Sequence, residues 1–513
     1  MRSKNAIFNI ITSLFLQLII IIYGFIVPKI IISEYGSSVN GLVSSITQFL
    51  GYISLLQAGF GPVVKSLLYK PIANKDKTEI ANILKATEKF FRNIAKIFIL
   101  YIILLAIFYP LLIDNQFGYF YTLSLIVIIS ISIFTEYYFG MTYSLYLQAE
   151  QKNYIISIFQ AVTYLLSIIC VIILVKFDVS IHLIKLVSGL IFVFRPIFLI
   201  IYVKKLYNIK FSSNNDNYVI KNKWDGLAQH IAAVIHGNTD ITLLTIFCKL
   251  SEVSVYSVYY LVVNGIKKIV LTFSDSINSS WGDMIAKNEK KNLIEKFNAY
   301  EVVYNIIVTI IFSSALILIV PFVSVYTKNI VDVNYVRYTF GYLIVISEYI
   351  CMIRLPYINL AYAAGHFKQT RIGAWVECIS NIFISIIFVR KYGLVGVTIG
   401  TIIAMFIRTC EFVYHSNKYI LNRSIWSSVK KIMLVIIETI IIILISKILP
   451  FYDNVNYLNW VLNSIIVVLI SVMVTFSLNI IFYKNELKNM LKLVKSVFRR
   501  KNNGNRKEYK KTN

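Results

Sequence analysis

The sequence predicts an all-α membrane protein with about fourteen transmembrane helices, arranged as two six-helix bundles and an extra helix pair. Three observations predict this fold class: an apolar composition, a series of long apolar runs, and an internal repeat that divides them. Hydrophobic residues make up 58% of the 513 residues, and the mean hydropathy is +0.70. A backbone in lipid must satisfy its own hydrogen bonds, so each run is expected to be a helix.

The apolar runs follow one another along the chain, and little between them could fold as a soluble domain. A run of about 20 residues, rising about 1.5 Å per residue, matches the roughly 30 Å hydrocarbon layer. The first run is long and lacks a small-residue cleavage site, so it is expected to be a retained helix. The predicted spans are residues 6–32, 39–68, 91–113, 118–148, 154–175, 181–203, 227–248, 253–280, 299–320, 338–364, 371–389, 394–416, 430–449 and 458–483.

The distribution of Lys and Arg predicts the topology. An even number of spans places both termini on one side of the membrane. Most basic residues fall in the N-terminus, in the loops after even-numbered spans and in the tail after Tyr483. The positive-inside rule therefore places both termini in the cytoplasm. The opposite loops are short and contain few cations, which are Lys29, Lys176, Lys249, Lys328, Arg337, Arg390 and Lys391.

The charge and the cysteines exclude two other classes of protein. The formal net charge of +26 would suggest nucleic-acid binding in a soluble chain. Here the positive-inside rule explains it better, and the basic tail is expected to lie against anionic lipid headgroups. The cysteines lie singly in apolar runs with no CxxC motif, so neither a disulfide framework nor a metal site is predicted: Cys170, Cys248, Cys351, Cys378 and Cys410.

An internal repeat divides the spans. Residues 72–77 (IANKDK) match residues 285–290 (IAKNEK), and Glu88 matches Glu301 at the same offset. A weaker match relates residues 148–153 to residues 363–368. An offset of six helices preserves orientation, which predicts parallel repeats with a substrate path between them. The alternative is that any amphipathic Lys/Glu segment after a membrane helix looks similar. The predicted domains are residues 1–210 and 211–420 as bundles, 421–483 as the extra helix pair, and 484–513 as a basic tail.

Several short segments carry a family resemblance. They are residues 51–62 (GYISLLQAGFGP), 147–152 (LQAEQK), 363–370 (AAGHFKQT) and 392–401 (YGLVGVTIGT). With two six-helix repeats and both termini inside, residues 1–483 resemble the multidrug/oligosaccharidyl-lipid/polysaccharide (MOP) exporter superfamily. Within it, the chain is most similar to the Wzx-type flippases of bacterial polysaccharide synthesis. Gln57 departs from the pattern, because many relatives carry an acidic residue there, and an ion-coupling role at this position is in doubt.

The resemblance implies a V-shaped, alternating-access transporter with a central cavity. Its implied substrate is an undecaprenyl-diphosphate-linked oligosaccharide repeat unit, flipped across the bacterial cytoplasmic membrane for capsule, O-antigen or other extracellular polysaccharide. It implies no cofactor, and a polysaccharide polymerase and glycosyltransferases are possible partners. A monomer is expected, since one chain supplies both halves of the path. The alternatives within the superfamily are a multidrug exporter and an exporter of peptidoglycan or teichoic-acid precursors.

Cations inside the predicted helices are the first candidate site residues. A buried ionisable side chain costs at least a few kcal/mol, so it usually faces a wet cavity or a partner. Arg binds two phosphate oxygens at once and Lys supplies a point charge, as an anionic lipid diphosphate requires. The predicted cationic cavity consists of Arg195, Lys267, Arg354 and Lys65. For Lys65 and Lys268 the alternative is snorkelling to the cytoplasmic surface, and for both arginines it is a structural ion pair.

The polar span 227–248 supplies candidates for coupling to a proton gradient. His236 and Asp240 are four residues apart and share a helix face. A pair that gains and loses a proton could couple transport to the gradient, with Glu348 as a further acid. The alternative is a hydrogen-bonded pair that only fixes the packing of this helix.

Other acids have simpler interpretations. Glu136, Glu348 and Glu377 could each offset a nearby Arg or Lys, and Arg408 with Glu411 is expected to form a local pair. The sequence contains no Walker A loop, GxGxxG or HExxH motif, and no large loop presents paired carboxylates. A transporter is therefore expected rather than an enzyme. A membrane polymerase or acyltransferase is the competing interpretation, but the short outer loops do not favour it.

Overall fold

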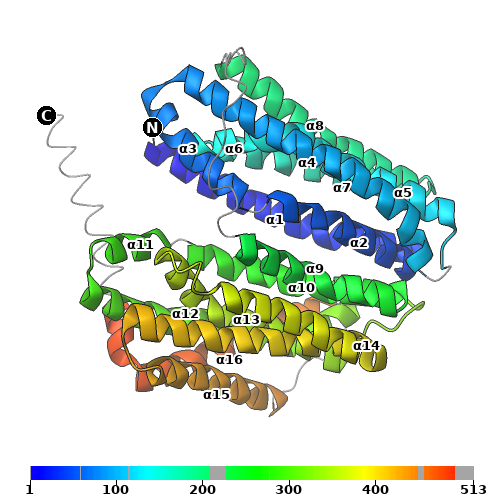
Figure 1. The fold of residues 1–513 in the computed structure, drawn as a ribbon. Helices are drawn as coiled ribbons and strands as arrows, with labels where there is room; N and C mark the ends of the chain where they lie inside the picture. The colour runs from blue at the N-terminus through cyan, green and yellow to red at the C-terminus, as the bar shows by residue number, and fades with distance from the viewer. Residues whose placement is uncertain are drawn as a thin grey trace, which may run out of the picture. The chain divides into compact units, whose positions relative to one another are not determined.

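The computed structural model describes residues 2–57, 59–113, 116–207, 227–275, 278–448 and 456–490, and these ranges contain helices and no strand (Figure 1). The helices are α1 (Arg2–Tyr35), α2 (Ser37–Gly51), α3 (Phe60–Asn74), α4 (Lys77–Leu112), α5 (Tyr119–Thr135), α6 (Met141–Ala149), α7 (Asn153–Val175), α8 (Ile181–Tyr207), α9 (Leu227–Phe247), α10 (Leu250–Asp275), α11 (Asn278–Ala286), α12 (Lys290–Tyr326), α13 (Tyr338–Ala363), α14 (Arg371–His415), α15 (Trp426–Ile448) and α16 (Tyr457–Phe482). Two π-helical segments, Glu136–Gly140 and Ser416–Leu421, continue α5 and α14.

Every predicted apolar run falls on one or more of these helices. By length and composition, 10 helical segments of the described ranges could cross a membrane. The protein is thus an all-helical, multi-pass membrane protein. Three helices, α9, α10 and α15, are more polar or more charged and are not among the ten. The number of fourteen crossings stays a prediction.

Helix α14 accounts for the remaining difference between the fourteen predicted spans and the 10 helical segments that could cross a membrane. The runs 371–389 and 394–416 were expected as separate spans, whereas the structure forms one element with a kink at Gly393. This residue has φ 51° and ψ −122°, a conformation that only glycine adopts without strain. A Cβ at Gly396 would collide with the carbonyl of Phe388, so glycine also permits the close approach across the kink.

The two loops that revealed the repeat have the same backbone geometry. Lys75 and Asn288 both have positive φ, 57° and 54°. The amide of the residue after each, Asp76 or Glu289, donates to the carbonyl five residues earlier. These bonds close the ends of α3 and α11 in the same way. The repeated sequence therefore encodes a repeated turn.

The weaker match gives a second pair of equivalent turns. Gln151 has φ 59° and Gly365 has φ 73°. In both turns the following residue, Lys152 or His366, donates its amide to the carbonyl five residues back. The first pair of turns has the same offset as its sequence match, and the second differs from its sequence match by one residue. The predicted domain boundaries themselves stay a prediction, and the basic tail lies largely outside the described residues.

The chain forms two compact units. The first comprises Met1–Leu261, Asn329–Asn334 and Ile384–Val397, and the second comprises Val262–Lys328, Tyr335–Phe383 and Thr398–Asn513. In the first unit α7 packs against α1 and α8, α5 packs against α8, and α9 packs against α2. In the second unit α12 packs against α13, α15 and α16 (Figure 1). Each unit contains buried charges, described next.

Candidate functional site

Arg195 on α8 forms an ion pair inside the first unit. Its Nη2 lies 2.5 Å from Oε2 of Glu136, in the π-helical segment that follows α5. A π-bulge adds a residue to a helical turn and often marks a functional position. Gly140, at the end of this segment, leaves room for the carboxylate, because a Cβ there would lie 2.8 Å from Oε2 of Glu136. Both charged side chains are about one-fifth exposed.

Lys267 on α10 forms an ion pair inside the second unit. Its Nζ lies 2.8 Å from Oε2 of Glu348 on α13. Glu348 is buried and Lys267 is partly exposed. The pair therefore joins a residue predicted for substrate binding to one predicted for proton coupling.

Arg354 belongs to a chain of four alternating charges in the second unit. Its Nη1 lies 2.9 Å from Oε1 of Glu377 on α14, whose Oε2 lies 3.2 Å from Nε of Arg408. Arg408 also donates to the carbonyl of Thr370 at 2.9 Å and pairs with Glu411. Arg354, Glu377 and Arg408 are buried. This chain contains the predicted local pair Arg408–Glu411, which the structure confirms.

Three of the four predicted cations are thus paired with the three acids that were expected either to couple protons or to offset charge. The pairs are Arg195–Glu136, Lys267–Glu348 and Arg354–Glu377. Lys65 on α3 is partly exposed and has no ion pair with any described residue. Whether any of these cations binds substrate stays a prediction.

The predicted His236–Asp240 pair is described only in part. Asp240 on α9 is buried and accepts a hydrogen bond from Tyr256 on α10, with 3.0 Å between the oxygens. The side chain of His236 lies outside the described part of the structure. The structure therefore connects Asp240 to α10, and its pairing with His236 stays a prediction.

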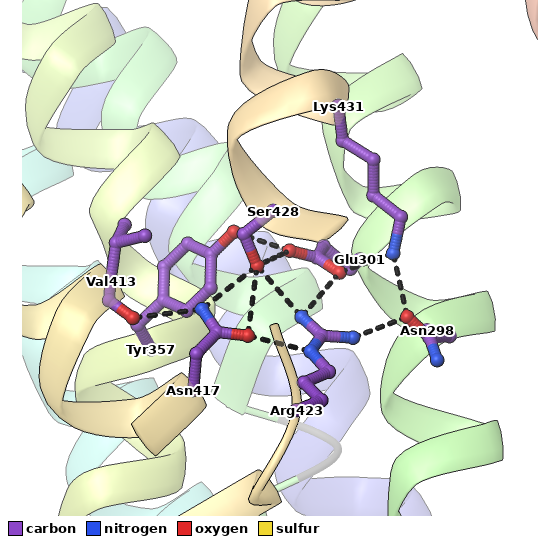
Figure 2. A network of polar contacts seen from close by, with 8 residues as sticks. All are labelled: Asn298, Glu301, Tyr357, Val413, Asn417, Arg423, Ser428 and Lys431. Atoms are coloured by element: carbon purple, nitrogen blue, oxygen red, sulfur yellow. Dashed lines mark hydrogen bonds and ion pairs between the residues drawn. The ribbon is translucent and has the colours of Figure 1, made fainter. Parts of the chain in front are cut away.

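A further cluster of polar residues was not among the predicted sites. Figure 2 shows Glu301 on α12 at its centre. Oε2 of Glu301 lies 3.0 Å from Nη2 of Arg423 and 2.5 Å from Nζ of Lys431 on α15. Oε1 accepts hydrogen bonds from Ser428 at 2.7 Å and from Tyr357 on α13. One carboxylate thereby connects α12, α13 and α15.

The sequence held only a weak signal for this cluster. Glu301 matches Glu88 in the repeat, yet the two residues have different surroundings. Glu88 pairs with Arg92 of its own helix at 2.6 Å, and both side chains are accessible to solvent. Glu301 is buried and takes its cations from the segment after α14 and from α15. Arg423 and Lys431 come from segments that the repeat does not include, so the repeat could not reveal the difference.

Comparison with known proteins shows the fold. No family model and no curated protein matches the chain. The lipid II flippase MurJ, in an inward closed conformation, has a TM-score of 0.69 at 17% identity, covering 93% of this chain and 99% of MurJ. An inward-facing multidrug resistance MATE transporter of the MOP superfamily has a TM-score of 0.61 at 12% identity, covering 79% and 97%. A MATE structure in the bent conformation has a TM-score of 0.54 at 12% identity, covering 86% and 97%. The chain has the fold of these transporters.

Proposed function

We propose that this protein flips an undecaprenyl-diphosphate-linked oligosaccharide repeat unit across the bacterial cytoplasmic membrane, from the inner to the outer leaflet. The product would supply an extracellular polysaccharide such as a capsule or O-antigen. The observation that carries the proposal is the fold, which is shared over nearly the whole chain with a flippase of another lipid-linked precursor. Both termini would be cytoplasmic, and the protein would work as a monomer beside glycosyltransferases and a polymerase.

The buried and partly buried ion pairs supply chemistry suited to an anionic headgroup. Buried cations are retained only with partners, since an unpaired charge in a helix interior is costly. A glutamate keeps each cation neutralised until a diphosphate exchanges with the carboxylate. Arg354 also has one unused hydrogen-bond donor, because its buried Nε has no acceptor among the described residues. Arg354 and Lys267 are therefore the proposed headgroup contacts in the second unit, and Arg195 is the contact in the first.

Proton coupling would complete the cycle. Asp240, held by Tyr256, and Glu348, held by Lys267, are proposed to exchange protons with the gradient, together with His236. His236→Ala and Asp240→Asn should each reduce gradient-driven flipping without lowering membrane levels. Normal flipping by both variants would exclude this part of the proposal.

Two alternatives use the same fold. A peptidoglycan-precursor exporter is favoured by the similarity to MurJ, which acts on lipid II. A multidrug exporter is favoured by the similarity to the MATE transporters. The first would also need cations for a diphosphate, whereas the second would not depend on Arg195 and Arg354. Competition between lipid-linked precursors and organic cations for binding therefore separates the classes.

The binding experiment uses the purified full chain in detergent. Arg195→Ala and Arg354→Ala should weaken binding of the lipid-linked oligosaccharide by about tenfold or more, as expected when a charge-assisted hydrogen bond is lost. Lys287→Ala is the matched control, because its pair with Asp283 is exposed. Unchanged binding by both arginine variants would remove the headgroup role of these residues.

A further inference from the structure

Helix α16 buries an unusual face for a membrane helix. Its buried residues recur every four positions along one side, and three of the four are polar: Val467, Ser471, Thr475 and Asn479. Ser471 contacts Ser313 and Ser314 of α12 at 3.3 and 3.1 Å. Small polar residues allow close helix packing in a membrane. Asn479 is larger than these serines, and its side chain contacts α15.

Asn479 binds a buried carboxyl group on α15. Its Nδ2 donates to Oε1 of Glu438 at 2.6 Å, and Glu438 is only 1% exposed. The same asparagine also donates to the carbonyl of Thr475 at 2.9 Å. Asn479 is therefore oriented by its own helix toward the acid on the neighbouring one.

Glu438 differs from the other buried glutamates because no cation of the described residues pairs with it. Each of the others has a cationic partner: Glu301 with Arg423 and Lys431, Glu348 with Lys267, and Glu377 with Arg354 and Arg408. No Lys or Arg of the described ranges forms an ion pair with Glu438. The neutral amide of Asn479 contacts it in place of a charge.

Among the residues that the structure describes, the titratable groups that face Glu438 are the phenols of Tyr349 on α13 and Tyr483 after α16. Tyr349 already contacts Thr439 at 3.0 Å. On its own helix the nearest cation is Lys431, two turns away, and that lysine pairs with Glu301. An ionised carboxylate at this position would be buried without a compensating charge, which is costly in a protein interior.

We propose that Glu438 is a proton-binding site, held protonated between α15 and α16 and able to release its proton when the helix pair opens to water. The carboxylic acid accepts from Asn479 through Oε1 and carries its proton on the other oxygen. Opening of the helix contact would hydrate the group and favour the carboxylate, which is how buried acids serve as relays in transporters. Its use in coupling rests on the proposed function, whereas the proton binding does not.

The first test measures proton binding without any substrate. Infrared spectra of the purified full chain would be recorded across a pH series for wild type, Glu438→Gln and the control Glu411→Gln, whose side chain is 30% exposed. Wild type and the control should show a protonated carboxyl C=O band that is lost as the pH rises, and Glu438→Gln should lack it. Glutamine keeps an acceptor for Asn479, so the variant is expected to fold. The same band in Glu438→Gln, or a wild-type band that persists at every pH, would overturn the proposal.

A second test separates this site from the proposed function. Flipping of the lipid-linked oligosaccharide would be measured in proteoliposomes with and without a pH gradient. The gradient should accelerate wild type several-fold and leave Glu438→Gln unaffected. Acceleration of Glu438→Gln equal to that of wild type would exclude Glu438 from coupling. Absence of flipping by wild type would contradict the proposed function, while the infrared result would still decide whether Glu438 binds a proton.

Discussion

Nζ of Lys267 lies 2.8 Å from Oε2 of Glu348, so two residues expected to serve different steps of transport form one ion pair. The pair joins α10 to α13 within the second unit. A substrate anion that binds Lys267 would separate this lysine from the Glu348 carboxylate, which could then accept a proton. Substrate binding and proton uptake would in this way use the same contact.

The Lys267–Glu348 ion pair can be tested with a double-mutant cycle. Lys267→Met or Glu348→Leu alone should lower the free energy of unfolding by about 1.5–3 kcal/mol, because each removes a charge-assisted contact between α10 and α13. The double variant should recover most of this loss. Thermal unfolding of the purified protein in detergent measures all three. Additive losses in the double variant would mean that the two residues do not interact.

Glu377 predicts a larger loss than its neighbour Glu411. Glu377→Gln would leave two buried guanidinium groups, those of Arg354 and Arg408, without their shared carboxylate. The expected loss is several kcal/mol in unfolding free energy. Glu411→Gln is the control, since its side chain is 30% exposed and pairs within one helix, for which about 0–1 kcal/mol is expected. Equal losses for the two variants would contradict the described burial.

Gly140 predicts a steric effect on the Arg195–Glu136 pair. In Gly140→Ala the new methyl group would lie 2.8 Å from the Glu136 carboxylate and 3.0 Å from Cβ of Pro196. Such overpacking should cost about 1–3 kcal/mol in unfolding free energy. Gly265→Ala is the control, because nothing lies within 4 Å of its added Cβ, and alanine favours a helix. A stable Gly140→Ala protein with destabilised Gly265→Ala would refute this explanation.

Asp332 is expected to protect the first backbone amides of α2 from hydrogen exchange. Its carboxylate accepts from the amide of Ser37 at 2.6 Å and from the Ser37 hydroxyl at 2.8 Å, both within the first unit. Asp332→Ala should speed hydrogen exchange of the first amides of α2, since a lost N-terminal cap costs about 1 kcal/mol. Asp76→Ala, which removes the cap of α4, should instead affect only that helix. Unchanged exchange at Ser37 in Asp332→Ala would show that this contact does not protect the helix.

Much of the fold could be predicted because it depends on local sequence. Apolar runs located the helices, since lipid leaves a spanning segment few alternatives. The repeat located equivalent turns, because Lys75 and Asn288 lie in short segments that specify a helix end. Even the kink in α14 coincides with a predicted boundary, marked by Gly393.

The charge partners could not be predicted because they depend on tertiary packing. Arg408 and Glu411 are three residues apart, and helix geometry alone predicts their contact. Lys267 and Glu348, by contrast, come from different helices, and no sequence spacing links them. The same holds for Glu301, whose partners Arg423 and Lys431 lie more than a hundred positions away.

The most direct test of the central claim is a flipping assay with the full chain in proteoliposomes. The donor would be an undecaprenyl-diphosphate-linked oligosaccharide labelled on its sugar, and the readout its accessibility to a membrane-impermeant reagent on the opposite side. We expect flipping by wild type and reduced flipping by Arg354→Ala, with Lys287→Ala unchanged. Transport of an organic cation without any flipping of the lipid-linked sugar, at equal protein content, would contradict the account.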